Sequence, residues 1–150
     1  MPLTNSIAEQ KKAAAEAKIA EETARQAEEA ARRALRQKQK ENFLMTTGVS
    51  FETHRIVSYL GITSGEIFLG TGFISELSGA VNDLLGTTSN VLAEKLAQAK
   101  TMAVDKLVDR CIDIGANAVI GVDLAISTLA VNNMIVTCAN GTAVKVEPLD

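Results

Sequence analysis

Only a few residues of this 150-residue chain could take part in catalysis or hold a metal ion. His54 is the single histidine, and the two cysteines, Cys111 and Cys138, lie far apart with no Cys-x-x-Cys pattern. A zinc site needs three or four converging ligands, so we expect no metal and no other cofactor. His54 falls in a predicted loop near Glu52, where we expect it to face solvent. Both cysteines are expected to be reduced thiols that pack as small hydrophobic side chains.

The composition argues against several classes of function. The chain contains no Ser/His/Asp set, no phosphate-binding P-loop and no dinucleotide-binding glycine motif, so we do not expect an enzyme. Aromatic residues make up 3% of the chain and the formal net charge is −3, so neither base stacking nor a positive field favours nucleic acid. No apolar run of signal-peptide or membrane-spanning length occurs. These features predict a cytoplasmic protein that binds neither nucleic acid nor a membrane.

The chain changes character at Asn42, where we place a domain boundary. Residues 1–41 hold nine Lys/Arg and seven Glu, for a net charge of +2, and they contain no aromatic residue. Residues 42–150 hold six Lys/Arg and eleven Asp/Glu, for a net charge of −5, together with all ten glycines. We therefore expect a helical N-terminal segment, 1–41, followed by a globular domain, 42–150.

Residues 6–41 are predicted to form one long helix, because Ala, Glu, Lys, Arg and Gln are strong helix formers. Ser6 and Glu9 fit a capping box at its start. Three Glu/Arg pairs at a spacing of four support the helix: Glu21 with Arg25, Glu28 with Arg32, and Glu29 with Arg33. Seven alanines recur at alternating spacings of four and three, as in a heptad seam, and we call them the alanine stripe: Ala13, Ala17, Ala20, Ala24, Ala27, Ala31 and Ala34.

Several roles remain open for this helix. It could be a charged helix surrounded by solvent, because its composition alone favours a helix. It could instead associate with other copies through the alanine stripe, or dock another protein. Alanine buries little area, so at about 25 cal/mol per Å² the stripe provides only a weak contact. Binding to a membrane surface is disfavoured, because the helix lacks the large apolar residues that insertion needs, even though its end is basic at Arg32, Arg33, Arg36, Lys38 and Lys40.

Strands are predicted in both halves of the globular domain. Residues 55–60 and 65–70 form two of them, separated by glycine. A half-buried strand is indicated further on by apolar residues that alternate with small or polar ones: Ile120, Val122, Leu124 and Ile126. Residues 134–139 and 142–146 flank Asn140-Gly141, which predicts a hairpin turn because both residues tolerate positive φ.

Two helices are predicted between these strands. The shorter one follows Gly72 and ends at Gly86. The longer one begins near Ser89 or Asn90 and ends at Gly115. Its apolar residues form one stripe, which we expect to be buried: Leu92, Leu96, Ala99, Ala103, Leu107, Cys111 and Ile114. The order of elements predicts an α+β domain in which helices cover one face of a mostly antiparallel sheet.

Five short motifs of the globular domain occur together in one protein family. They are Gly61-Ile-Thr-Ser-Gly-Glu66, Leu69-Gly70, Asn82-Asp83 before Gly86, Ile114-Gly-Ala-Asn-Ala-Val-Ile-Gly-Val-Asp123 and Asn140-Gly-Thr-Ala-Val144. In these motifs the chain resembles the YbjQ family, which is labelled heavy-metal-binding. The resemblance spans residues 44–147 and leaves the N-terminal helix outside. The Gly-Ala-Asn-Ala-Val-Ile-Gly-Val-Asp segment and the Gly-Thr-Ala-Val ending are each a weak indication of the family, but their occurrence in one chain is specific for it.

The resemblance implies a compact subunit that assembles into a homopentameric β/α ring, in which added strands join the neighbours. It implies no established biochemical activity. Two positions depart from the family pattern: Asn82-Asp83 stands where the family has Arg-Asp, and Gly86-Thr-Thr-Ser89 stands where it has Gly-Gly-Arg-Ser. An anionic ligand that those arginines hold in relatives is therefore not expected here.

Three acidic residues, Glu66, Asp83 and Asp123, lie within the resembling motifs and are the candidate ligand-binding residues. A structural role at a strand edge or helix cap is the alternative for each. Our first hypothesis is a non-enzymatic, self-assembling ring protein, a pentamer or stacked pentamers, whose helix assists assembly or docks another protein. The second hypothesis is a module that binds a small ligand or heavy metal at subunit junctions. An enzyme ranks third.

Overall fold

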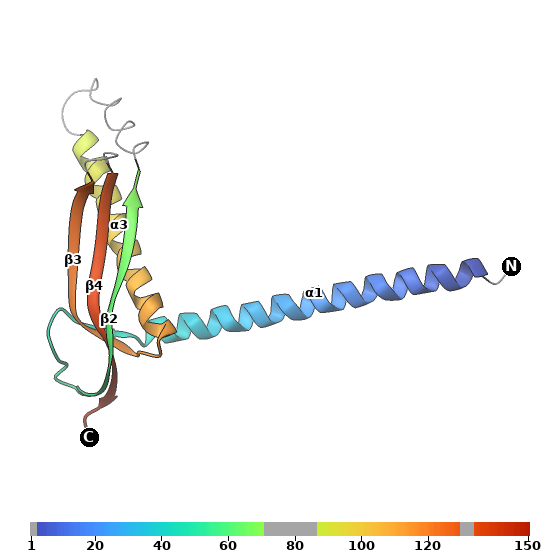
Figure 1. Cartoon of the computed structure of the whole chain (residues 1–150), viewed down its shortest axis with the longest axis horizontal. Helices are drawn as coiled ribbons and strands as arrows, with labels where there is room; N and C mark the ends of the chain where they lie inside the picture. The colour runs from blue at the N-terminus through green and yellow to red at the C-terminus, as the bar shows by residue number, and fades with distance from the viewer. Residues whose placement is uncertain (1–2, 71–86, 130–133) are drawn as a thin grey trace. The chain divides into compact units, whose positions relative to one another are not determined.

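The computed structural model of the chain describes residues 3–70, 87–129 and 134–150. The chain divides into two compact units, Met1–Glu41 and Asn42–Asp150. The first unit contains helix α1, Leu3–Glu41 (Figure 1). The second unit combines a four-stranded sheet with helix α3, Thr87–Asp113. The α+β class expected from the sequence is confirmed.

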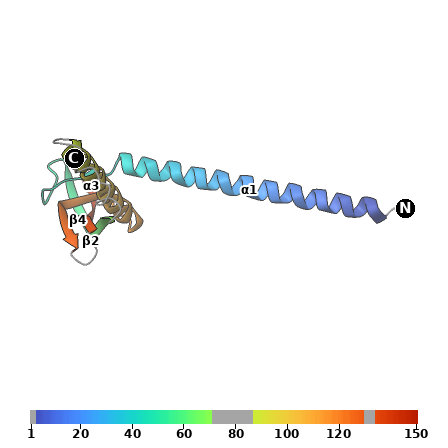
Figure 2. The same ribbon diagram turned by 90° about the horizontal axis from the view of Figure 1, so that it is seen from above.

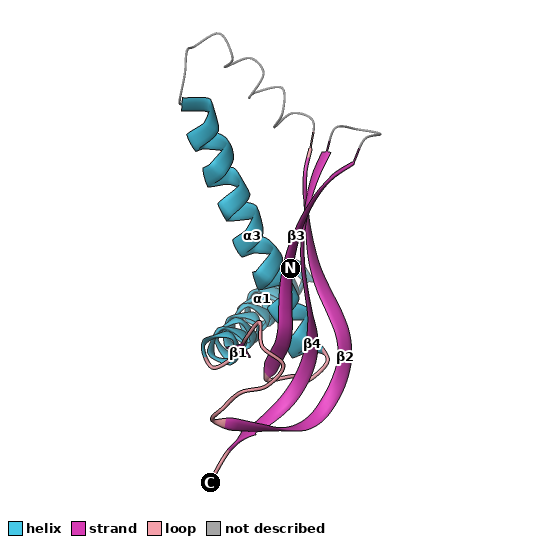
Figure 3. Ribbon diagram, turned by 90° about the vertical axis from the view of Figure 1, so that its left-hand side faces the viewer, coloured by secondary structure: helices cyan, strands magenta, loops and turns pink. Residues whose placement is uncertain are grey.

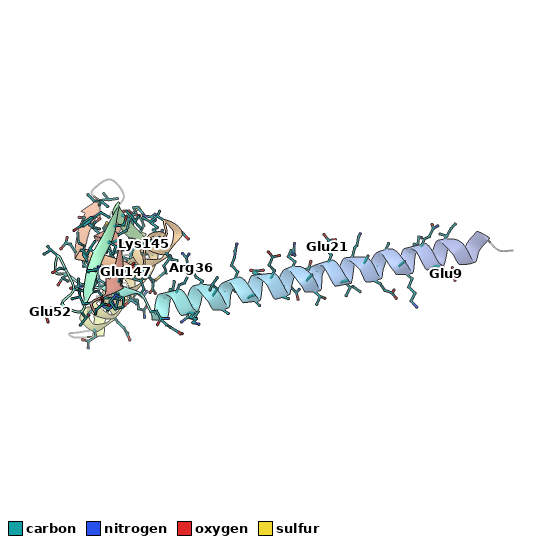
Figure 4. The ribbon with its side chains drawn as sticks, turned by 90° about the horizontal axis from the view of Figure 1, so that it is seen from below. Glu9, Glu21, Arg36, Glu52, Lys145 and Glu147 are labelled. Atoms are coloured by element: carbon teal, nitrogen blue, oxygen red, sulfur yellow. The ribbon has the colours of Figure 1, made fainter. Side chains whose placement is uncertain are left out.

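Helix α1 starts earlier than predicted. It begins at Leu3, so Ser6 lies inside the helix and does not cap it. Residues 7–41 are exposed, apart from Arg36 and Lys40, which are half-buried. The whole alanine stripe is therefore exposed, and Figure 4 shows side chains such as Glu9 and Glu21 extending outward from α1. No helix in the described ranges combines the length and apolar character needed to cross a membrane.

Ion pairs along α1 follow the predicted spacing in one case and shift in another. Arg33 Nη2 lies 2.6 Å from Glu29 Oε1, as predicted. Arg25 pairs with Glu22 at 2.9 Å and not with the predicted Glu21. Since these side chains are largely exposed, each pair adds only a few tenths of a kcal/mol to helix stability, on the order of 0.2–0.5 kcal/mol.

The sheet of the second unit has the strand order β1-β3-β4-β2. Its strands are β1 (Leu44–Met45), β2 (His54–Leu69), β3 (Ala118–Leu129) and β4 (Met134–Pro148). Strand β4 pairs antiparallel with both β2 and β3, whereas the short β1 runs parallel to β3. Strand β2 therefore forms one edge of the sheet. On the other side, β1 pairs with only the first two residues of β3.

Helix α3 lies along one face of this sheet, beside β2 and β4 (Figures 2 and 3). The predicted stripe forms its buried face at Ala99, Ala103, Leu107 and Cys111, which confirms this part of the prediction. Ile114 is instead 49% exposed, because α3 ends at Asp113 and Gly115 turns the chain with a φ of 86°. The predicted short helix before Gly86 and the Leu92 side chain lie outside the described residues.

The core between α3 and the sheet consists mainly of small residues. Helix residues Ala103, Leu107 and Cys111 pack with Ala116, which lies in the turn between α3 and β3. They also pack with three residues of the sheet: Val119, Ala139 and Ala143. A second cluster on the sheet comprises Ala118, Ile120, Val144 and Val146. Small side chains bring the helix and the sheet close together, so the distance between their backbones is short.

Gly65 of β2 is a point of close approach between α3 and the sheet. A Cβ atom added at Gly65 would lie 2.5 Å from the backbone nitrogen of Leu107 and closer still to the carbonyl oxygen of Ala103. Both atoms belong to the helix backbone, so they cannot move aside by a side-chain rotation. Glycine at this position therefore allows α3 to rest directly on β2.

Strand β2 contains both segments that were predicted to be separate strands. Gly61 lies inside the strand with a φ of 115°, and pairing with β4 shifts register just before it, between Tyr59 and Gly61. A second register shift lies between Ile56 and Ser58. The glycine thus accommodates an irregularity in one continuous strand, and the prediction that the strand ends near it is wrong.

The predicted hairpin turn at Asn140-Gly141 is also wrong. Both residues lie in the middle of β4, and Gly141 does not have the positive φ that a type I′ turn requires. A Cβ atom added at Gly141 would lie 2.5 Å from Cγ2 of Val119. Glycine is needed here because a side chain of β3 packs closely over the β4 backbone.

The predicted alternation in β3 holds only at its start. Ile120 is buried and Val122 is half-buried, but Leu124 and Ile126 are 44% and 45% exposed. The pairing with β4 shifts register between Ile120 and Asp123, around Gly121 with its φ of 61°. In addition, α3 packs mainly on β2 and β4, so it leaves the second half of β3 uncovered.

The close contact at Gly65 can be tested by a substitution that adds one methyl group to this residue. We expect Gly65→Ala to lower the free energy of unfolding by about 1–3 kcal/mol, because α3 must move away from β2. Urea denaturation followed by circular dichroism measures this change. Gly70→Ala is the matched control, because no atom of the described residues beyond its chain neighbours lies within 4 Å of its added Cβ and its φ is not positive. Equal stabilities of the two variants would contradict the close approach.

Candidate functional site

Glu66, a candidate ligand-binding residue, belongs to a polar cluster at the outer edge of β2. Gly65 faces α3, so the alternation of the strand turns the side chains of Ser64 and Glu66 toward the opposite face. Lys106 and Arg110, one turn apart on α3, reach around the edge of the strand to meet them. We call Ser64, Glu66, Lys106 and Arg110 the edge cluster.

Hydrogen bonds connect all four members of the edge cluster. Arg110 Nη1 donates to Glu66 Oε2 at 2.8 Å and also to the carbonyl oxygen of Ser64. Lys106 Nζ donates to the carbonyl oxygen of Glu66 at 3.1 Å. The Ser64 hydroxyl donates to Glu66 Oε1. The Glu66 and Arg110 side chains are 31% and 42% exposed, so the ion pair is half-buried.

The electrostatics of Glu66 follow from these partners. The hydrogen bond from Ser64 holds the pKa of Glu66 below its ordinary value of 4.5, and the hydrogen bond and charge of Arg110 act in the same direction. Partial burial opposes them. At neutral pH Glu66 is therefore a carboxylate with both oxygens engaged. It is suited to holding α3 against β2 and poorly suited to proton transfer.

Asp123, the second candidate, is not part of the edge cluster. It is an exposed residue of β3, and it pairs in register with Asn140 of β4, which in turn pairs with Ser64 of β2. Two strand spacings, roughly 10 Å, therefore separate the backbones of Asp123 and Ser64. Asp83, the third candidate, lies outside the described residues. The structure thus does not bring Glu66 and Asp123 into one site.

The two cysteines and His54 occupy unrelated positions. Cys111 is buried under α3, and burial raises the pKa of its thiol to about 11, so the thiol is protonated at neutral pH. Cys138 is half-buried, with its thiol 3.3 Å from Oδ1 of Asn140. His54 is the first residue of β2 and not a loop residue as predicted, and its Nδ1 lies 2.8 Å from Thr53 Oγ1. In the described ranges no three His, Cys, Asp or Glu residues converge as metal ligands would.

A second notable feature is the unpaired edge of β3. Backbone bonds from the segment after β1 cover β3 only as far as Val122, whose N–H donates to the carbonyl oxygen of Thr46 at 3.1 Å. Beyond that residue no described strand other than β4 pairs with β3. Exposed apolar side chains occur along this part at Leu124, Ile126 and Leu129, each 44–45% exposed. We call residues 123–129 the open β3 edge.

The backbone groups of the open β3 edge can be assigned from the sheet register. The carbonyl groups of Ser64 and Glu66 point away from β4, because α3 side chains bind them from outside. In an antiparallel sheet the backbone groups of successive residues point alternately to the two sides of a strand. Asn140, which pairs with Ser64, therefore turns its backbone groups toward Asp123 of β3. The N–H and C=O groups of Leu124, Ile126 and Thr128 then point outward, away from β4. These groups have the arrangement that an added strand would pair with.

A separate apolar surface lies on β2 between Val57 and Ile62, at the opposite edge of the sheet. Its members are Val57, Tyr59 and Ile62, which are 47%, 68% and 86% exposed. We call these three residues the β2 apolar surface. The domain therefore presents two different apolar surfaces, one at each side of the same sheet.

Sequence reasoning missed Lys106, Arg110 and the open β3 edge. The two cations are four residues apart and next to the buried positions Leu107 and Cys111, which is the only signal in the sequence that they flank a helix–sheet contact. Nothing in the sequence shows that they bind main-chain carbonyls, because those partners lie 40 and 46 positions away.

Known proteins resemble the second unit of the chain, Asn42–Asp150. Residues 43–147 match the YbjQ family model, described as "putative heavy-metal-binding". A UPF0145 protein of Anoxybacillus flavithermus is 40% identical over 104 residues, which cover 69% of this chain and 98% of that protein. A UPF0145 protein of Geobacillus kaustophilus is 38% identical with the same coverage. Among solved structures, a DUF74-family protein of unknown function from Pediococcus pentosaceus gives a TM-score of 0.48 at 14% identity, covering 70% of this chain and 98% of that one.

The edge cluster predicts a specific dependence of stability on pH. A carboxyl group with a lowered pKa in the folded state contributes stability above its unfolded pKa, and the contribution disappears as pH falls through the folded pKa. We expect Glu66→Gln to lower the free energy of unfolding by about 0.5–1 kcal/mol near neutral pH, and by less as pH falls below 4.5. Denaturant titrations across this range, with Glu52→Gln as an exposed control, measure the effect. A loss that stays constant with pH would refute the assigned role of Glu66.

Proposed function

The chain belongs to the YbjQ family, and on that premise we propose that it is a non-enzymatic subunit that assembles with copies of itself into a closed ring, with α1 as an assembly or docking element. The observation that carries this proposal is the open β3 edge. It supplies a row of outward backbone groups that no strand in the described ranges pairs with, together with three exposed apolar side chains.

Soluble proteins rarely leave such an edge uncovered. They protect edge strands with charged side chains, proline, bulges or a covering segment, because an unpaired edge is a template for another chain. The open β3 edge begins with the charged Asp123 just after a register shift, but its remaining residues, 124–129, contain no charged residue and no proline. A second copy of the chain that pairs with this edge would satisfy the outward backbone groups of Leu124, Ile126 and Thr128, and it would bury their apolar neighbours.

The two apolar surfaces favour a head-to-tail arrangement. The open β3 edge and the β2 apolar surface differ in residues and lie at opposite sides of the sheet, so a contact between them would be heterologous. Heterologous contacts produce a ring when the rotation between neighbours closes, and a filament when it does not. The resemblance to the YbjQ family makes five subunits the expected number.

Two candidate groups for catalysis or ligand binding, Glu66 and Cys111, are engaged elsewhere. The Glu66 carboxylate binds Ser64 and Arg110, and the Cys111 thiol is buried and protonated. A ligand or heavy-metal site at subunit junctions would need Glu66, Asp83 and Asp123 to converge. The commitment of Glu66 to Arg110 disfavours that alternative.

The assembly proposal makes a direct prediction about size. We expect the full chain to sediment as an oligomer of the 15.9 kDa subunit at micromolar concentration. Ile126→Lys should shift it toward monomer, because a lysine on the open β3 edge opposes strand pairing. Ile114→Lys is the matched control, since Ile114 is 49% exposed and lies outside both apolar surfaces. A monomeric wild type at this concentration would eliminate the proposal.

Helix α1 would contribute to assembly through its exposed alanine stripe. An isolated pair of such helices associates weakly, because each alanine buries little surface. A ring would hold several copies of α1 at fixed attachment points, which raises their effective concentration toward the millimolar range and offsets the weak contact. Association within one ring or between two rings would then produce a larger particle than the domain alone forms.

Charge placed on the alanine stripe tests this role of α1. We expect Ala20→Glu with Ala27→Glu to reduce the mass of the particle, because carboxylates cannot be buried between helices without partners. The control is Ala8→Glu with Ala15→Glu, which adds the same charge on the opposite side of α1. Native mass spectrometry reports the mass of each variant. An unchanged mass in both variants would show that the stripe does not self-associate and would favour docking to another protein.

A further inference from the structure

The two edges of the sheet differ in which groups bind their outward backbone N–H and C=O groups. On β3, the outward backbone groups after Val122 have no partner in a described strand. On β2, the outward carbonyl oxygens of Ser64 and Glu66 accept hydrogen bonds from Arg110 and Lys106 of α3. The helix that covers one face of the sheet therefore also occupies part of its edge.

These two cations stand where an added strand would place its N–H groups. Strand addition to β2 requires the outward carbonyls of alternate residues, and Ser64 and Glu66 supply them in this half of the strand. A strand that approached from outside would have to displace Lys106 and Arg110 from both carbonyls. It would also have to break the 2.8 Å ion pair between Arg110 and Glu66, which anchors the guanidinium at the edge.

The first half of β2 carries a different obstacle to strand addition. Its pairing with β4 shifts register between Ile56 and Ser58 and again between Tyr59 and Gly61. Such irregularities bend the strand and interrupt the even row of backbone groups that pairing needs. Regular pairing is therefore hindered along β2 by irregular backbone in one half and by α3 side chains in the other.

We propose that Lys106 and Arg110 form an edge guard that closes β2 to strand addition, so that strands of other copies add only at the open β3 edge. This inference rests on the proposed self-assembly. Without the guard, the open β3 edge of one copy could pair with the β2 edge of the next and continue one sheet from subunit to subunit. Repetition of that contact produces a filament when the rotation between neighbours does not close, whereas a guarded β2 excludes the contact and leaves assembly to the ring.

The guard can be removed while its aliphatic stems are kept. In Lys106→Met with Arg110→Met, the side chains retain their apolar length but lose every donor to the β2 carbonyls. The control is Lys100→Met with Lys145→Met, which replaces two exposed lysines outside the edge cluster. Both double variants lose two positive charges from a chain of net charge −3, so charge repulsion between copies increases equally in the two.

Sedimentation velocity over a range of protein concentrations provides the first readout. We expect the wild type and the control variant to keep one size distribution. The guard variant should form larger species that grow with concentration, despite its higher net charge. An unchanged size distribution of the guard variant would overturn the proposal. If the double variant does not fold, as judged by circular dichroism, Arg110→Met alone is compared with Lys100→Met in the same way.

Hydrogen–deuterium exchange identifies the edge that is used. The backbone N–H groups of Ser64 and Glu66 point away from β4, so they should exchange fast in the wild type. In the larger species of the guard variant we expect their exchange to slow by about tenfold or more, because an added strand would bind them. Larger species without this protection, or protection already present in the wild type, would refute the guard. A wild-type monomer would refute the ring but not the guard, whose test is growth on removal of Lys106 and Arg110.

Discussion

The direct contact between the backbone of α3 and Gly65 of β2 determines how the rest of the domain is arranged. Because no side chain separates the two backbones, Ala103 and Leu107 reach the sheet and pack with Ala139 of β4. The same contact turns Ser64 and Glu66 to the far side of the strand and brings Lys106 and Arg110 within reach of its edge. A larger residue at position 65 would therefore disturb both the core and the edge cluster.

Placement of α3 on β2 and β4 has a consequence for β3. Helix α3 packs mainly on β2 and β4, so Leu124 and Ile126 remain exposed even though their alternation is that of the apolar face of a half-buried strand. The domain thus has one edge bound by its own helix and another that no described strand other than β4 pairs with after Val122. This asymmetry is the property of the fold that relates most directly to the proposed self-assembly, since outward backbone groups on β3 can accept a strand while α3 side chains bind those of Ser64 and Glu66.

Helix α1 depends on different physics. Its residues are exposed along almost the whole length, so its helicity comes from intrinsic propensity and local ion pairs such as Arg33 with Glu29, and not from tertiary packing. It lies outside the part of the chain that matches the family model. The fold of the domain and the exposed surface of α1 are therefore two separate features of the chain.

The sequence by itself determined the elements whose signals are local. Helix propensity and periodicity predicted α1 and the buried stripe of α3 at Ala103, Leu107 and Cys111, and the motifs between Gly61 and Val144 indicated the family. Only the tertiary structure decided that Gly61 lies within one strand and that Asn140-Gly141 lies inside another. It also decided which sheet edge is occupied and that Glu66 binds Arg110. The physical reason is that a glycine that allows a turn and a glycine that allows close packing look alike in a sequence, and which groups occupy a strand edge depends on residues distant in the chain.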